Sequence, residues 1–429
     1  MGFANQYIEN NKLFRDFISV YPRKDLKYIV VIPSYNEDRI TNTLDALWEA
    51  QRPRHSVEVI VLVNASQCTP ESVKENNRRT ISEIEIWQAV HNDSSFNVFA
   101  LCVQNLSEKD FGAGLARKIG MDEAISRLDK LDRHDGYIIS LDADTIVDEN
   151  YFKTIEQTVK QMPGINAGII YFEHPAEGNE FTQAVYDAVV KYELFLRYYN
   201  QALRWTGFPY AFHTIGSAFF VSAQAYVKQG GMIRRKAGED FYFLNKIFQL
   251  GNIREVHSTT VYPSPRISGR VLFGTGPEVE KIIKYPDKSY LTYNPKAFQS
   301  LKRFFSGIDQ LFQCRNTDIQ NFLNMLDPGL RGFLQSIGFQ REIKRINDNC
   351  KRIEVFRKHF FQWFGGLKIV RYMHLLHEEH FRKVPVHQAA SEMLEILGYS
   401  KILSSLSSFD SRRLLHAYRN IERESEFGI

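Results

Sequence analysis

Short apolar runs alternate with longer amphipathic stretches over the front part of the chain. The runs are rich in Val and Ile, as expected for strands buried on both faces of a sheet. We expect strands at residues 28–32, 57–63, 98–103, 137–139, 169–172, 216–221 and 253–256, and helices through Leu44 and Leu47, at 72–90, through Ala116 and Ile125, at 181–203 and at 241–250. This alternation predicts an α/β fold, with a mostly parallel central sheet flanked by helices.

From about Asn294 onward the pattern is helical and rich in Phe and Leu, which predicts a C-terminal helical region. This region carries more Lys and Arg than Asp and Glu, and aromatic residues accompany the basic ones at 344–371. Two interpretations stay open: peripheral contact with an anionic membrane, or a helical bundle packed against the rest of the chain.

Composition places the chain among folded proteins, with 44% hydrophobic and 24% charged residues in 429. The four cysteines are far apart in sequence and form no metal-binding pair, which favours a reducing compartment. The first residues are too polar for a signal peptide, and no apolar run approaches the ~20 residues that cross a bilayer. We therefore expect a cytoplasmic protein, with peripheral attachment to the inner face of the membrane as a variant. No motif of nucleic-acid binding is present, and the oligomeric state stays open.

Two carboxylates, Asp142 and Asp144, follow the apolar run at 137–139. At the end of a strand, side chains spaced i, i+2 point to the same side and can converge on one cation. Mg²⁺ and Mn²⁺ prefer oxygen ligands and leave positions open for substrate phosphates. The pair therefore predicts a metal–diphosphate site. The alternative is that acidic residues here serve a helix N-terminus, since Asp148 and Glu149 open the next helix.

Parallel sheets bind their ligands at the carboxyl ends of the strands. This rule places residues 33–37, Asn64, residues 112–117 and residues 142–144 on one edge of the predicted sheet. Four separate polar signals on one edge favour a single binding site.

Four motifs, in this order and spacing, resemble those of GT-A fold glycosyltransferases close to family 2, over residues 28–276. They are residues 31–37, the glycine-rich turn that leads to Arg117, Asp142-Ala143-Asp144, and Gly238-Glu239-Asp240. The resemblance implies a GT-A catalytic domain at 26–290, between a helical lead-in at 1–25 and a C-terminal helical domain or extension at 291–429. It also implies transfer of a sugar from a nucleotide-sugar donor to the hydroxyl of a sugar, lipid-linked or small-molecule acceptor, with Mn²⁺ or Mg²⁺ as cofactor.

On the donor side, the resemblance implies that Pro33, Tyr35 and Glu37 border the base and ribose and that Arg117 lies near the nucleotide. Family members usually carry Asp at the position of Asn64, and an amide donates as well as accepts hydrogen bonds. The identity of the base therefore stays open.

The metal role falls by resemblance on Asp144, with Asp142 on the metal or the ribose and Ala143 between them in the nucleotide-sugar motif. His257 is a candidate for a further metal ligand, because some GT-A enzymes use a histidine at this place. A structural role is the alternative, since a lone histidine is more often structural.

The same resemblance implies Asp240 as the base that takes the proton of the acceptor hydroxyl, with Glu239 positioning the acceptor. Without the resemblance, capping of the following apolar helix is the simpler interpretation of this acidic pair. Both roles are compatible.

The resemblance also implies that Gly216 and Ser217 lie beneath the acceptor pocket, where a small residue leaves room. Arg266 and Arg270 lie in a loop rich in Pro, Ser and Gly, and they suit a diphosphate or an anionic acceptor. An ordinary basic surface loop is the alternative.

An inverting transferase with Asp240 as base is the leading hypothesis. A retaining GT-A enzyme acting on a phosphorylated or carboxylated acceptor, and a non-catalytic nucleotide-sugar-binding protein, stay as alternatives. A dinucleotide-dependent oxidoreductase is disfavoured, because Arg117 stands where the third glycine of the Gly-x-Gly-x-x-Gly motif belongs.

Overall fold

The computed structural model describes residues 2–91, 93–109, 111–269, 273–286, 288–405, 410–425 and 428. By internal contacts the chain divides into two compact units. The first comprises Met1–Val189, Thr214–Ile283 and Glu422–Ile429, and the second comprises Val190–His213 and Lys284–Ile421. Each unit therefore combines segments that are distant in the sequence.

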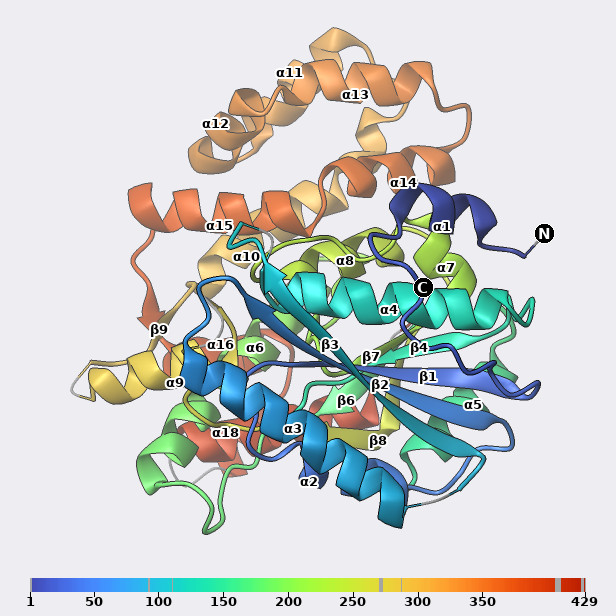
Figure 1. The fold of residues 1–429 in the computed structure, drawn as a ribbon. Helices are drawn as coiled ribbons and strands as arrows, with labels where there is room; N and C mark the ends of the chain where they lie inside the picture. The colour runs from blue at the N-terminus through green and yellow to red at the C-terminus, as the bar shows by residue number, and fades with distance from the viewer. Residues whose placement is uncertain are drawn as a thin grey trace. The chain divides into compact units, whose positions relative to one another are not determined.

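The first unit is built on an eight-stranded sheet in the order β3-β2-β1-β4-β7-β6-β8-β5 (Figure 1). The strands are β1 (Leu26–Ser34), β2 (Ser56–Ser66), β3 (Phe96–Leu106), β4 (Tyr137–Ser140), β5 (Ile146–Val147), β6 (Ala167–Phe172), β7 (Phe219–Ser222) and β8 (Ile253–Tyr262). β7 runs antiparallel to β4 and β6, and β5 runs antiparallel to β8, while the other neighbours pair in parallel. The predicted mostly parallel sheet is confirmed, and it is the architecture that the resemblance implies.

Helices lie on both faces of this sheet. The helices of the first unit are α1 (Asn5–Asn11), α2 (Ile40–Glu49), α3 (Glu71–Val90), α4 (Ala113–Asp129), α5 (Tyr151–Gln161), the first part of α6 (Gln183–Trp205), α7 (Ala223–Lys228), α8 (Glu239–Phe248) and α9 (Thr275–Lys284). Right-handed crossovers put α2 and α3 on one face and α4 on the other, as Figure 1 shows. α4 lies so close to β1 that a methyl group on Gly120 would be 2.5 Å from Cγ1 of Val31.

The N-terminal segment is bound to α4 by buried carboxylates. The hydroxyls of Tyr7 and Tyr226 both donate to Asp122 at 2.7 Å, and the amide of Ile18 donates to Glu123 at 3.1 Å. Only Asn5–Asn11 of the expected helical lead-in is helical. The rest follows α4 without regular structure, because side chains of α4 supply partners for its backbone.

The sheet differs from the sequence prediction mainly in length. The expected end of the first strand at residue 32 was wrong, since β1 continues to Ser34 and Pro33 pairs with Leu62 of β2. β8 extends to Tyr262, well beyond the expected end at Val256, because an irregularity after Val256 lets the strand resume pairing with β6. The short strand β5 was not predicted, since two residues carry no detectable period.

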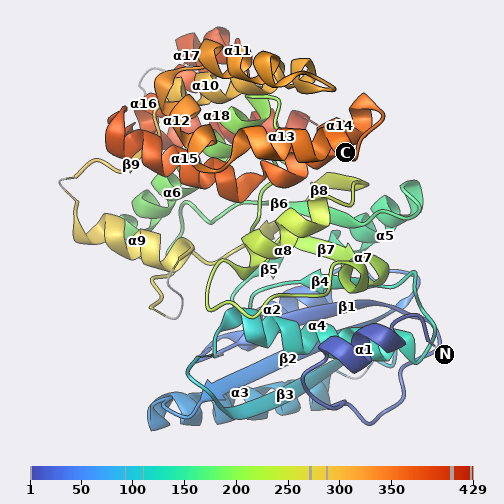
Figure 2. The ribbon, with the colours of Figure 1, turned by 90° about the horizontal axis from the view of Figure 1, so that it is seen from above.

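The second unit is largely helical (Figure 2). Its elements are the second part of α6, β9 (Leu291–Thr292), α10 (Pro295–Ser306), a 3₁₀ turn (Ile308–Leu311), α11 (Asn316–Met325), α12 (Pro328–Ser336), α13 (Phe339–Asp348), α14 (Ile353–Trp363), α15 (Gly366–Glu379), β10 (Val384–Pro385), α16 (Val386–Ile396), α17 (Ser400–Ser405) and most of α18 (Ser411–Glu424). Its core is a cluster of phenylalanine rings around Phe304, which contacts Phe339, Phe360 and Phe364. The predicted C-terminal helical region is confirmed. Across the described residues, no helix combines the length and the apolar character that crossing a membrane requires.

Candidate active site

The carboxyl ends of β1, β2 and β4 meet at one edge of the sheet in the first unit. β7 runs antiparallel to β4, with Phe219 opposite Ser140, so the residues just before β7 lie at this same edge. This reversal brings Gly216 and Ser217 to the end of β4. The edge carries five acidic side chains, which we call the rim carboxylates: Glu37, Asp142, Asp144, Glu239 and Asp240.

The buried guanidinium of Arg117, in the second turn of α4, connects three of the elements at this edge. Its Nη2 donates to Asp142 at 3.0 Å, and its Nε donates to Glu239 at 3.3 Å. Its Nη1 donates to Oγ of Ser140 at 2.7 Å and to the carbonyl of Gly216 at 3.0 Å, and the Ser140 hydroxyl donates to that same carbonyl. Arg117 therefore holds Asp142, Glu239 and the approach to β7 in one network.

The structure gives protein partners to two residues for which the resemblance implied substrate roles. Arg117 was expected near the nucleotide; its side chain is 4% exposed, and each of its three nitrogens donates to a protein group. Glu239 was expected to position the acceptor, and it is buried against Arg117. Burial alone lowers the pKa of Arg117, but the charges of Asp142 and Glu239 outweigh it and raise that pKa, so the guanidinium stays charged.

Asp240 follows Glu239 in the first turn of α8 and lies against Gly216. A methyl group on Gly216 would be 3.1 Å from Oδ2 of Asp240 and 2.7 Å from Nη2 of Arg117. The carboxylate accepts the amide of Phe241 at 2.7 Å, so it also serves the start of α8. The two interpretations of Glu239-Asp240, capping and chemistry, are compatible in this geometry.

Asp240 is distinguished from the other rim carboxylates by its lack of a cationic partner. In the described part of the chain, Glu37, Asp142, Asp144 and Glu239 each form an ion pair with an arginine, whereas Asp240 forms none. Burial and the nearby charge of Glu239 raise the pKa of Asp240 to about 7, against a lowering by Arg117. A carboxylate with this pKa can accept a proton at neutral pH.

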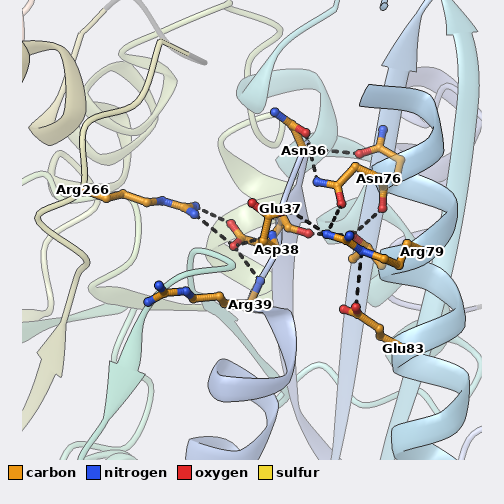
Figure 3. A network of polar contacts seen from close by, with 10 residues as sticks. Asn36, Glu37, Asp38, Arg39, Asn76, Arg79, Glu83 and Arg266 are labelled. Carbon is orange, nitrogen blue, oxygen red and sulfur yellow. Dashed lines mark hydrogen bonds and ion pairs between the residues drawn. The ribbon is translucent and has the colours of Figure 1, made fainter. Parts of the chain in front are cut away.

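Arg266, from the loop after β8, binds two further rim carboxylates. Its guanidinium pairs with both oxygens of the fully buried Glu37, with Nη1 at 3.0 Å from Oε1, and its Nη2 lies 2.6 Å from Oδ2 of Asp144. Figure 3 shows Arg266 reaching Glu37 from the opposite side to the Asn36–Asn76–Arg79 network. The expectation that Arg266 serves this edge agrees with its position, and Arg270 lies outside the described residues.

The donor set at Asp142 and Asp144 suits a hard divalent cation. Both are carboxylates at the end of β4, with side chains 39% and 26% exposed, and Asp144 already holds one cation, the guanidinium of Arg266. Among the described residues, no group of three or more His, Cys, Asp or Glu side chains has a metal-binding arrangement. Mg²⁺ bound together with substrate phosphates commonly takes only one or two carboxylates from the protein.

His257 is not brought to these carboxylates. Its ring lies 3.3 Å from Glu255 and stands edge-on to Tyr171, inside β8 and not at its end. β5 pairs antiparallel with β8, with Ile146 opposite Tyr262, so Asp144 lies beyond the end of β8.

The expected nucleotide side is built from the ends of β1 and β2. Tyr35 lies edge-on to Phe111 at 5.0 Å between ring centroids. Asn36 has a left-handed backbone conformation, with φ of 51°. Its backbone N–H donates to the side-chain oxygen of Asn77 at 2.9 Å. Asn77 in turn donates to the carbonyl of Asn64 at 3.1 Å. One buried amide on α3 therefore joins the two strand ends.

The remaining predicted residues lie around this centre. Pro33 is half-buried in β1, and the buried Ala143 uses its carbonyl to accept the hydroxyl of Thr43 at 3.0 Å. Among the described residues, the side chain of Asn64 makes one long hydrogen bond, 3.4 Å, to the carbonyl of Gly112. Oγ of Ser217 is buried and has no hydrogen-bond partner among the described residues, which leaves it for a ligand or water.

Sequence reasoning missed Ser140 and Asn77, which position other residues of the site. Ser140 is the last residue of β4, and its polarity after an apolar run was a usable signal. Asn77 lies within a polar helical stretch, where nothing in the pattern distinguishes it from its exposed neighbours.

Replacing Gly216 by alanine tests the close approach of Arg117 and Asp240. The added methyl must displace both, so we expect a loss of about 1–3 kcal/mol in the free energy of unfolding and a ~100-fold loss of activity. Denaturant unfolding and turnover measure these effects. Gly332→Ala is the control, because nothing lies within 4 Å of an added methyl there. Wild-type behaviour of Gly216→Ala would contradict the observed packing.

The raised pKa of Asp240 predicts a pH-dependent effect on stability. The folded state holds the carboxyl proton of Asp240 more tightly than the unfolded chain does. The resulting contribution to the free energy of unfolding is therefore complete below pH 3.8 and is lost as the pH rises through about 7. Asparagine does not ionise, so Asp240→Asn should not lose this stability as the pH rises. We expect the variant to be more stable than the wild type at pH 8, by on the order of 2 kcal/mol, with little difference near pH 4.

Urea unfolding at several pH values measures this difference. Asp132→Asn, at an exposed position, controls for the loss of one negative charge. An Asp240→Asn variant that is less stable than the wild type at pH 8 contradicts the assignment.

No protein family and no curated protein matches this chain in sequence. Among solved structures, the chain is similar to S. aureus TarS 1-349 in complex with UDP-GlcNAc, with a TM-score of 0.41 and 13% identity over 79% of this chain and 92% of the TarS chain. The same fragment in complex with UDP is similar with a TM-score of 0.38 and 14% identity, over 79% of this chain and 92% of the TarS chain. A longer TarS chain is similar with a TM-score of 0.36 and 13% identity, over 82% of this chain and 55% of the TarS chain.

Proposed function

We propose that this protein is a glycosyltransferase, similar to family 2, that moves a sugar from a nucleotide-sugar to an acceptor hydroxyl. The observation that carries the proposal is the state of Asp240. It is the rim carboxylate without a cationic partner in the described structure, and Arg117 joins its neighbour Glu239 to Asp142. A proton acceptor thus lies beside a pair of carboxylates suited to a metal–diphosphate. Sugar transfer needs both a base and a site for the diphosphate.

Asp240 is the proposed base of an inverting reaction. The acceptor hydroxyl gives its proton to the carboxylate as its oxygen attacks the anomeric carbon, and the bond from that carbon to the diphosphate oxygen breaks. A pKa of about 7 places the proton-accepting form within reach at neutral pH. Direct displacement from the side of the base inverts the anomeric configuration.

Asp144 and Asp142 are the proposed ligands of a divalent cation, Mn²⁺ or Mg²⁺. When bound, such a cation offsets the charge that develops on the departing nucleoside diphosphate. Arg117 donates a hydrogen bond to Asp142 and so holds this carboxylate in position. Ser217 has a buried hydroxyl next to the site.

The proposal is tested with UDP-, GDP- and ADP-sugars, each with Mn²⁺ and with EDTA. One nucleotide class should raise the melting temperature in the presence of Mn²⁺, and EDTA should remove the shift. Asp240→Asn should keep this shift but lose transfer by about 10²–10⁴-fold, because only the base is missing.

Full transfer by Asp240→Asn rules out Asp240 as the base. Absence of any metal-dependent shift across the panel contradicts the proposed donor site. The anomeric configuration of the product, read by NMR, separates the inverting reaction from a retaining one.

We propose further that the acceptor carries negative charge. Arg234, Arg235 and Lys236 are exposed immediately before Gly238, and none of them forms an ion pair among the described residues. The segment has a fixed position, since a methyl on Gly114 would be 2.2 Å from the carbonyl oxygen of Arg235 and 3.0 Å from Cβ of Glu239. Arg235 also stacks on Tyr242 at 3.7 Å. Three cations without an ion pair among the described residues, four to six residues before Asp240 in the sequence, favour phosphate or carboxylate on the incoming molecule.

Matched acceptors test this charge preference. Release of nucleoside diphosphate should be stimulated at least about tenfold more by glucose 6-phosphate than by glucose, as expected for one or two charge-assisted contacts. Arg234→Ala and Lys236→Ala should reduce this preference without changing the rate with glucose. Equal stimulation by the two acceptors contradicts the proposal.

A further inference from the structure

Arg266 forms an ion pair with Asp144, the same carboxylate that is proposed to bind the divalent cation. Its Nη2 is 2.6 Å from Oδ2 of Asp144, the residue proposed to bind the cation, and the same guanidinium is paired with Glu37. A guanidinium and a divalent cation on the same carboxylate repel each other, because two positive charges then lie a few ångströms apart. Cation binding through Oδ2 of Asp144 is therefore favoured when Arg266 leaves this oxygen.

Glu37 gives Arg266 a second, independent anchor. The Glu37 side chain is fully buried, and its Oε1 also accepts the amides of Asp38 at 3.0 Å and Arg39 at 3.1 Å. A buried carboxylate strongly disfavours losing its counter-charge. Asp144, with a side chain 26% exposed, is the weaker of the two partners. Arg266 can thus release Asp144 and remain on Glu37.

One donor of Arg266 is left for a ligand. Its Nε is buried and has no hydrogen-bond partner among the described residues. A guanidinium bound to carboxylates on one edge and free on another fits an incoming phosphate oxygen.

We propose that Arg266 is an internal cation that occupies Asp144 before the donor binds and exchanges that contact for the diphosphate when a divalent cation takes its place. The inference rests on the proposed function. It makes Arg266 a competitor of the free cation and a partner of the cation–diphosphate complex, so that the free cation binds weakly and the complete donor binds well.

Two binding measurements with opposite expected signs test this exchange. With Mn²⁺ alone, followed by electron paramagnetic resonance, Arg266→Ala should bind about tenfold more tightly than the wild type, because the competing guanidinium no longer lies on Asp144. With Mn²⁺ and inorganic pyrophosphate, the same variant should bind pyrophosphate about tenfold more weakly, because a charge-assisted partner is missing. A purely structural role for Arg266 moves both affinities in the same direction.

Arg79→Ala is the matched control. This exposed arginine belongs to the network in Figure 3 and contacts Asp38 and Asn76 but not Asp144, so both affinities should stay within twofold of the wild type. Arg266→Gln keeps hydrogen bonds to Glu37 without the charge, and it replaces Arg266→Ala if that variant does not fold. Unchanged or weaker Mn²⁺ binding by the Arg266 variant overturns the exchange.

The outcome separates the exchange from the proposed function. Opposite shifts without sugar transfer to any acceptor support the exchange and contradict the transferase. Sugar transfer with no opposite shifts supports the transferase and contradicts the exchange.

Discussion

The site depends on one buried charge, the guanidinium of Arg117. Removing such a group from water costs several kcal/mol unless it is paired and hydrogen-bonded. Two carboxylates, a serine hydroxyl and a backbone carbonyl meet this demand from β4, α8 and the approach to β7. Because these partners come from three different elements, the guanidinium fixes the elements relative to one another, and with them the two halves of the proposed site.

The rim carboxylates would repel one another without such partners. Arg117 neutralises Asp142 and Glu239, while Arg266 neutralises Glu37 and Asp144. Asp240 is left with burial and a neighbouring negative charge, which together raise its pKa to about 7. The protein therefore keeps a carboxylate that is unfavourable for stability at neutral pH, a trade typical of functional sites.

The two arginines differ in how firmly they are held. Arg117 is almost completely buried, and its partners are all parts of the protein framework. Arg266 is 21% exposed, lies on a loop and has one buried nitrogen without a partner among the described residues. The first is suited to a fixed structural role and the second to a contact that changes when a ligand binds.

The sequence by itself determined the alternation of strands and helices, the helical C-terminal region and the sheet edge at which the polar motifs gather. These follow from local periodicity and from the rule that ligands bind at the carboxyl ends of parallel strands, so residues 33–37, 112–117 and 142–144 were placed without the structure. Only the tertiary structure decided which charges pair. The contacts Arg117–Glu239 and Arg266–Asp144 join residues more than a hundred positions apart, and no periodicity encodes them. The reversal of β7 and the extension of β8 likewise depend on pairing with distant strands, and they bring Gly216 to the site while leaving His257 away from it.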